Sequence, residues 1–236
     1  MFFLFSGEGP TDLGRCMNPV SECHGADYVH GPLTVVVDQI VDARRGYSLL
    51  GTGFYGFVPK GTLAVRASEL KATRKSLGLP GRKTPRETRY FYNNARILSR
   101  IAREREAEVN KEVVAVFFRD SDGVQSSGRG LWNDKVASML SGFDVEGFAR
   151  GVPMIPKPKS EAWILCALKY GYQGDALEDR SGNDNSPNSL KGELEEHTGQ
   201  LSCPDLVELV ESRAIDIDQL KMPSFAAFRT RLEAVI

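Results

Sequence analysis

Continuous apolar runs and amphipathic runs alternate along this chain. The segments FFLFSG, near the start, and EVVAVFFRD, in the middle, are apolar at successive positions and rich in aromatic or β-branched residues. Such runs are typical of strands that are covered on both faces of a sheet. A third run, EGFARGVPMI, predicts a further strand, and TGFYGFVPKG predicts a short strand or an edge hairpin.

The segments between these strands have helical patterns. Helices are predicted over LTVVVDQIVDARR, LWNDKVASMLSGF and KSEAWILCALKYG, the last ended by Gly171. In TPRE, Thr84 as N-cap, Pro85 at the first helical position and Glu87 predict the start of a helix that runs to about Glu108. NSLKGELEEHTG and the segments after Asp205 are also predicted to be helical. The alternation predicts an α/β fold, with a parallel sheet connected by right-handed crossovers.

Length and composition are compatible with one large domain. The chain has 236 residues, and no Gly/Ser-rich or Pro-rich linker divides it. We expect a main domain over residues 1–170, with a basic insertion at about 50–108, and a helical C-terminal extension over 171–236 packed on it. The run MFFLF is too short to span a membrane and lacks the features of a signal peptide, so a cytoplasmic protein is expected. Reduced thiols are therefore expected at Cys16, Cys23, Cys166 and Cys203.

Charge is distributed unevenly along the chain. Residues 66–106 carry twelve Lys or Arg and four Glu, so this segment is strongly basic although the net charge of the whole chain is −1. On the helix after TPRE, Arg89, Arg96, Arg100 and Arg103 recur at helical spacing and predict one basic stripe. Such asymmetry favours a polyanionic partner, although an ordinary solvated face is the alternative.

Acidic residues follow the two strongest predicted strands. Glu8 and Asp12 follow the first strand, and Asp120 and Asp122 follow the second. Because ligands bind beyond the carboxyl ends of parallel strands, we expect these carboxylates to converge there. Converging carboxylates repel one another unless a cation lies among them, and hard oxygen ligands suit Mg²⁺ or Mn²⁺.

An apolar strand ending in EGPTD, followed by a second strand ending in DSD, resembles the Toprim superfamily. The later PMIPKPKSEAWILCAL resembles a helix of small, stand-alone prokaryotic Toprim-like proteins, several of which occur in anti-phage defence loci. The resemblance covers roughly residues 1–170. The Toprim superfamily includes the nucleases of the OLD family. The resemblance implies a Toprim-like sheet flanked by helices, with Glu8 as general acid or base and Asp120 and Asp122 as metal ligands.

The resemblance also implies a metal-binding role for Asp12, and position after the third predicted strand adds Lys157, Lys159 and Glu161. Asp12 and Glu161 are candidate ligands of a second metal, and Lys157 and Lys159 are candidate cations that stabilise a pentavalent phosphate. Asp12 as a helix cap, and Ser160 and Glu161 as an ordinary helix start, are the alternatives. Arg82 and Lys83, with the stripe of arginines, are candidate nucleic-acid contacts.

These features together predict a Mg²⁺- or Mn²⁺-dependent nuclease acting on DNA or RNA, as the effector of an anti-phage defence system. The chain has no GxxxxGK phosphate loop, so any nucleotide hydrolysis would fall to a partner ATPase. A catalytically silent scaffold that binds nucleic acid or such an ATPase is the second hypothesis. Assembly of several copies of the chain is left open.

Two weaker alternatives remain. AVFFRDSDGV also resembles the signature of haloacid-dehalogenase-like phosphatases, in which Asp120 would be the nucleophile, and GDALED imitates the acidic motif of that family. That motif should cap a buried strand, whereas a predicted helix precedes GDALED. A zinc site at Cys16, Cys23, His24 and His30 is disfavoured because the two cysteines are too far apart in the sequence.

Overall fold

The computed structural model describes residues 1–73, 86–121, 131–168, 174–199 and 201–236. Its central sheet has the order β3-β5-β1-β6-β7. Strands β1 (Phe2–Gly7), β5 (Tyr55–Pro59), β6 (Val113–Phe118) and β7 (Gly151–Met154) are parallel, and β3 (Cys23–His24) pairs with β5 in the antiparallel sense. The predicted α/β fold with a mostly parallel sheet is therefore confirmed.

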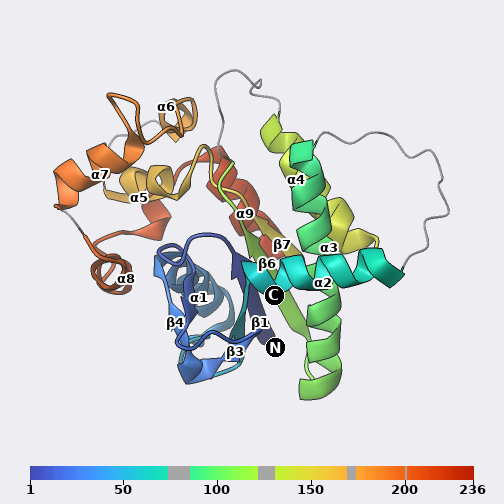
Figure 1. Ribbon diagram of the computed structural model, residues 1–236. Coiled ribbons are helices and arrows are strands. Elements are labelled where there is room, and N and C mark those ends of the chain that lie inside the picture. The colour runs from blue at the N-terminus through green and yellow to red at the C-terminus, as the bar shows by residue number, and fades with distance from the viewer. Residues whose placement is uncertain (74–85, 122–130, 169–173, 200) are drawn as a thin grey trace.

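Helices cover both faces of this sheet (Figure 1). Phe3 and Phe5 of β1 pack in a core with α1 (Pro32–Arg45), α5 (Ser160–Leu168) and α9 (Pro223–Glu233). Phe2 and Leu4, which alternate with them, pack in a second core with α3 (Arg86–Val109) and α4 (Leu131–Asp144). The continuous apolar run of β1 thus reflects burial on both faces.

The segment expected to be a basic insertion forms part of the central architecture. It supplies β5, which lies between β3 and β1 in the sheet, so this strand is not an edge hairpin. It also supplies α2 (Lys60–Thr73) and α3, and α3 ends at Val109, close to the predicted Glu108. The predicted start of that helix at Thr84 lies outside the described residues.

The C-terminal helices are joined to the same core. They are α6 (Gly174–Glu178), α7 (Leu190–Thr198), α8 (Cys203–Glu211) and α9, with a 3₁₀ turn at Ile217–Gln219. The buried Trp163 ring of α5 lies 5.1 Å from the Phe225 ring and 5.7 Å from the Phe228 ring of α9 (centroid distances). Its indole nitrogen also donates to the Ser224 hydroxyl at 2.9 Å. Trp163 is therefore a core residue that holds the C-terminal segment in place.

A small ribbon precedes α1. Strand β2 (Gly14–Cys16) pairs with β4 (Tyr28–His30), with β3 and a 3₁₀ turn at Gly25–Asp27 between them. Cys16 and Cys23 form a disulfide, so the expectation of four reduced thiols is wrong for this pair. The ribbon brings their Cα atoms to 5.7 Å, whereas Cys166 and Cys203 are free. No helix in the described parts of the chain is long and apolar enough to cross a bilayer.

The arginines of the predicted stripe are largely engaged within the protein. Glu146, just beyond α4, accepts from Nε of Arg96, and its other oxygen lies 2.9 Å from Nε of Arg100. Arg103 donates to the Glu146 carbonyl at 2.8 Å, and Arg89 is exposed. Arg96, Arg100 and Arg103 therefore fasten α3 to the end of α4, and contact of the stripe with a nucleic acid stays a prediction. Arg82 and Lys83 lie outside the described residues.

Burial opposes ionisation of Glu146, but hydrogen bonds from Arg96 and Arg100 outweigh it and hold the pKa of this carboxyl below its ordinary value. Replacing Glu146 by Gln should lower the free energy of unfolding by about 2 kcal/mol at pH 7, because two half-buried guanidinium groups lose their counter-ion. Urea denaturation would measure the change.

Glu104→Gln is the matched control. Glu104 and its partner Arg66 have side chains that are 53% and 47% exposed, so this ion pair should contribute at most about 0.5 kcal/mol. Equal losses in the two variants would contradict a special role for Glu146.

Candidate functional site

Three neighbouring strands end at the same level of the sheet. In the register of the sheet, Gly7 of β1 is opposite both Pro59 of β5 and Phe118 of β6. The residues that follow directly are Glu8, Lys60 and Arg119. One oxygen of Glu8, Oε2, lies 2.9 Å from Nζ of Lys60 and 3.2 Å from Nη1 of Arg119. A single carboxylate oxygen is therefore placed between two cations.

An aromatic ring positions Arg119. The centre of its guanidinium group lies 3.9 Å from the centroid of the Tyr90 ring, and Lys60 Nζ lies 5.8 Å from the same centroid. Planar guanidinium groups stack well on aromatic faces, and such contacts fix their orientation. Tyr90 belongs to α3, so this helix holds the cations in addition to covering the sheet.

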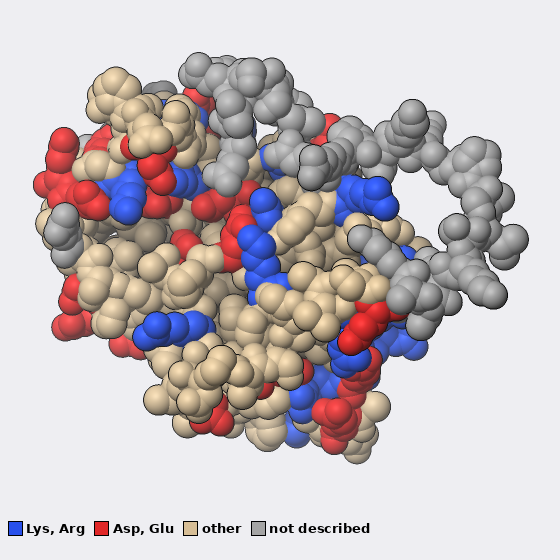
Figure 2. Space-filling view, viewed as in Figure 1, with Lys and Arg blue, Asp and Glu red and all other residues tan. Residues whose placement is uncertain are grey.

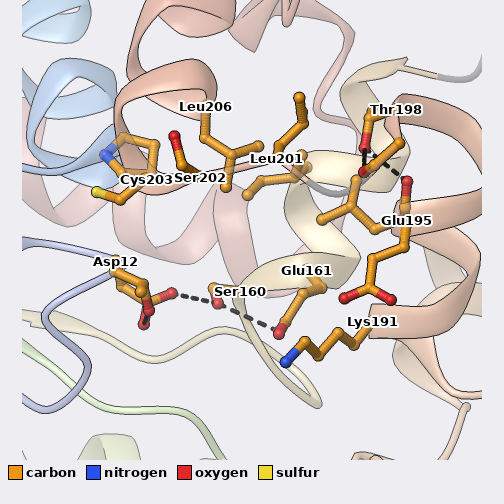
Figure 3. A pocket seen from close by; sticks show the side chains of 15 residues that line it. Asp12, Ser160, Glu161, Lys191, Glu195, Thr198, Leu201, Ser202, Cys203 and Leu206 are labelled. Carbon is orange, nitrogen blue, oxygen red and sulfur yellow. Dashed lines mark hydrogen bonds between the residues drawn. The ribbon is translucent and has the colours of Figure 1, made fainter.

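Three carboxylates meet at the first residue of α5. The Ser160 amide donates to Asp120 Oδ1 at 2.9 Å, and the Ser160 hydroxyl donates to Asp12 Oδ1 at 2.5 Å. Glu161 Oε2 lies 3.3 Å from the same hydroxyl oxygen (Figure 3). A hydroxyl has one proton to donate, so Glu161 is the weaker acceptor. We call Asp12, Asp120 and Glu161 the acidic cluster.

A tight turn places Asp12 in this cluster. Gly9 has a φ of +85°, and a Cβ atom at this position would lie 2.1 Å from Asp12 Oδ2. The turn closes with a hydrogen bond from the Asp12 amide to the Gly9 carbonyl at 3.2 Å. Glycine is therefore required both for the backbone conformation and for the approach of the Asp12 carboxylate.

The surroundings of Asp12 disfavour its ionisation. Burial raises its pKa from 3.8 to about 6, the Ser160 hydrogen bond counteracts this, and the Glu161 charge adds to it. Lys159 is the nearest cation with an opposing effect, but its ammonium binds Asp184 at 2.6 Å. The carboxylate of Asp12 thus lacks a dedicated counter-ion among the described residues.

A pocket of about 380 Å³ opens beside the acidic cluster (Figure 3). Asp12, Ser160 and Glu161 line one end. Apolar side chains from α5, α7 and α8 form much of the wall, and Lys191, Glu195 and Cys203 contribute polar atoms. The burial of Cys203, followed by the nearby Asp12 charge, raises the pKa of its thiol. The pocket has the mixed lining of a small-molecule or substrate site.

The two lysines predicted to act on a phosphate have other partners. Lys157 lies 3.5 Å from the buried carboxylate of Glu178, and Lys159 is buried between Asp184 and Glu161, at 2.6 and 3.9 Å. None of these ion pairs involves Glu8. The cations that pair with Glu8 are Lys60 and Arg119, and neither was predicted as a site residue. Each directly follows a strand, but this position becomes informative only once the register is known.

The predicted metal ligands fall into two groups. Glu8 is paired with Lys60 and Arg119, whereas Asp12, Asp120 and Glu161 share Ser160. Asp122 lies outside the described residues. Within the described ranges, no three His, Cys, Asp or Glu side chains are arranged so that they could hold a metal ion as they stand. The donor chemistry of the acidic cluster nevertheless fits a hard divalent cation, because it consists of carboxylates and includes one without a dedicated counter-ion.

The structure also bears on the two weaker alternatives. The GDALE portion of the phosphatase-like motif forms helix α6, so it does not cap a strand. The zinc alternative fails because Cys16 and Cys23 are bonded to each other. His24 lies 2.7 Å from Glu22, and His30 lies 3.5 Å from Glu211.

No family model matches the chain, and no match was found among curated proteins or solved structures. The site must therefore be interpreted from its own geometry.

The raised pKa of Asp12 predicts a pH-dependent stability. Since the folded protein holds this proton up to about pH 6 and the unfolded chain only to about 3.8, the free energy of unfolding should fall as the pH rises through that interval. Asp12→Asn removes the cost of ionisation. In EDTA above pH 7 it should be more stable than the wild type by about 3 kcal/mol, and below pH 4 nearly equal.

Denaturant unfolding from pH 3.5 to 8 would measure this difference. Asp27→Asn serves as control, because Asp27 is exposed and should show no such trend. A constant offset between Asp12→Asn and the wild type at every pH would contradict the assigned pKa.

Proposed function

We propose that this chain is a Mg²⁺- or Mn²⁺-dependent nuclease that hydrolyses phosphodiester bonds. The observation that carries the proposal is the convergence of Asp12, Asp120 and Glu161 on Ser160 at the carboxyl edge of the parallel sheet. The resemblance of EGPTD and DSD to the Toprim superfamily agrees with it. Asp12, Asp120 and Glu161 would hold the cation, which supplies Lewis-acid polarisation of the phosphate.

The remaining roles follow from the chemistry of the side chains. In the hydrolysis, a water oxygen bonds to phosphorus while the bond from phosphorus to the leaving ester oxygen breaks, and the leaving oxygen keeps the bonding electron pair and takes a proton from solvent. Glu8, at the same edge, accepts the proton of that water as a general base. The adjoining pocket has room for a part of the substrate next to the reacting phosphate.

Replacing either Asp120 or Asp12 by Asn should reduce Mn²⁺-dependent cleavage at least 100-fold, because each removes one negative charge from the acidic cluster. Cleavage of labelled single- and double-stranded DNA and RNA, with Mn²⁺, Mg²⁺ or EDTA, would be followed on gels. Asp27→Asn is the matched control and should retain the activity. Undiminished cleavage by both cluster variants would overturn the proposed metal site.

A silent scaffold is the second candidate. The observation that favours it is the ion pairing of Glu8 with both Lys60 and Arg119, since a carboxylate occupied in this way is not free to take a proton. Metal-dependent cleavage that is lost in Glu8→Gln supports the enzyme. Binding of nucleic acid without cleavage by the wild type, under every metal condition, supports the scaffold.

Two further measurements exclude or establish a phosphatase. A nuclease should not hydrolyse p-nitrophenyl phosphate, and mass spectrometry should detect no phosphorylated Asp120. Monoester turnover that is indifferent to Glu8→Gln would instead indicate an aspartyl-phosphate mechanism.

A further inference from the structure

We propose that Lys60 and Arg119 form a phosphate-binding site, which the Glu8 carboxylate occupies in the free protein and which a phosphate of the nucleic acid takes over. That the phosphate belongs to a nucleic acid rests on the proposed function. The existence of an anion site rests on the geometry alone.

The first argument is the position of one oxygen. Glu8 Oε2 is shared by the Lys60 ammonium at 2.9 Å and the Arg119 guanidinium at 3.2 Å. Within the described part of the chain, no other acid lies within ion-pairing distance of either cation. Two positive charges thus face one negative charge, and a phosphate diester can replace that charge without loss.

The second argument is an incomplete set of hydrogen bonds. Arg119 Nη1 is buried, yet no acceptor in the described residues is aligned with it, although Glu8 Oε2 lies within ion-pairing distance. A guanidinium group binds best to anions that present two oxygens side by side, as phosphate does. The geometry around Glu8 leaves this capacity unused.

The third argument is that Arg119 is held in place by aromatic rings while Lys60 is accessible from solvent. Tyr90 stacks on the Arg119 guanidinium at 3.9 Å, and the Phe91 ring centroid lies 5.4 Å from it. The Lys60 side chain is 51% exposed, so a ligand can reach the site from solvent. Figure 2 shows basic and acidic side chains next to one another near the centre of the face viewed there.

The fourth argument is the distance along the chain to the acidic cluster. Arg119 directly precedes Asp120, and Glu8 is four residues before Asp12. A phosphate held by Arg119 is therefore bound by the residue that directly precedes one of the carboxylates proposed to hold the cation. Its arrival also releases Glu8, whose oxygens are then free to accept the proton of the attacking water.

This exchange gives Glu8 opposite effects on binding and on cleavage. In EDTA, Glu8→Gln should bind a fluorescein-labelled 12-nucleotide DNA or RNA strand about five- to tenfold more tightly than the wild type, because the competing negative charge is gone. Arg119→Gln should bind at least tenfold more weakly, and its slope of log K against log salt should be smaller by about one. Fluorescence anisotropy at several salt concentrations measures both effects.

Matched variants separate this site from general charge effects. Arg66→Gln also removes one positive charge, but from the exposed pair with Glu104, and should bind like the wild type. Tyr90→Leu should weaken binding, whereas Tyr90→Phe retains the ring and should restore it. If thermal melts show that Arg119→Gln is not folded, Arg119→Lys, which keeps the charge, replaces it as the test. Arg119→Lys should bind the strand more weakly than the wild type because lysine lacks the planar guanidinium group.

The proposal would be overturned if Glu8→Gln bound the strand no more tightly than the wild type. It would also be overturned if folded Arg119 variants bound the strand as tightly as the wild type. The ion pairs of Glu8 with Lys60 and Arg119 would then have only a structural role. If cleavage depends on the acidic cluster while binding ignores both cations, the nuclease stands and the phosphate site fails. If binding follows the predictions but no metal supports cleavage, the phosphate site stands and the nuclease fails.

Discussion

The parallel pairing of β1 with β5 and β6 is the constraint on which the candidate site depends. Because Gly7 is opposite both Pro59 and Phe118, three strands leave the sheet at one level, and the next residue of each is charged. Both faces of the sheet are buried under helices, so the end of the strands is where charged side chains can be placed without being buried in the core. The register thus converts three separate sequence positions into one cluster.

Helix α5 organises the other half of the site. Its first amide and the Ser160 hydroxyl provide donors for Asp120 and Asp12, and the positive end of the helix favours negative charge there. This arrangement keeps the acids apart from Lys60 and Arg119, although Arg119 and Asp120 are consecutive. If the two sets of charges paired with each other, neither would be available to a ligand. Lys159, the cation best placed to neutralise the acids, is itself held by Asp184.

Most of the fold could be predicted because it depends on local patterns. The buried strands β1, β6 and β7 appear as apolar runs, and α1, α4 and α5 appear as helical patterns. What could not be predicted depends on pairing between distant segments. The glycines of TGFYGFVPKG left a short strand and an edge hairpin as alternatives, and only the order of the sheet shows that this strand is interior. Likewise, the pairing of Arg96 with Glu146 joins residues 50 positions apart in the sequence. The acids at the strand ends were predicted from their position alone. Recognising Lys60 and Arg119 as their neighbours requires the register of the strands, and pairing Cys16 with Cys23 requires the ribbon that brings them together.

The two charged clusters are linked by a short stretch of the chain. Glu8 and Asp12 lie on either side of one turn, and Gly9 lets the Asp12 carboxylate pack against its backbone. A cation at the acidic cluster would relieve the electrostatic cost that raises the pKa of Asp12, and it would add positive charge next to Arg119. Each ligand would thereby favour the other, and by linkage this coupling must be reciprocal.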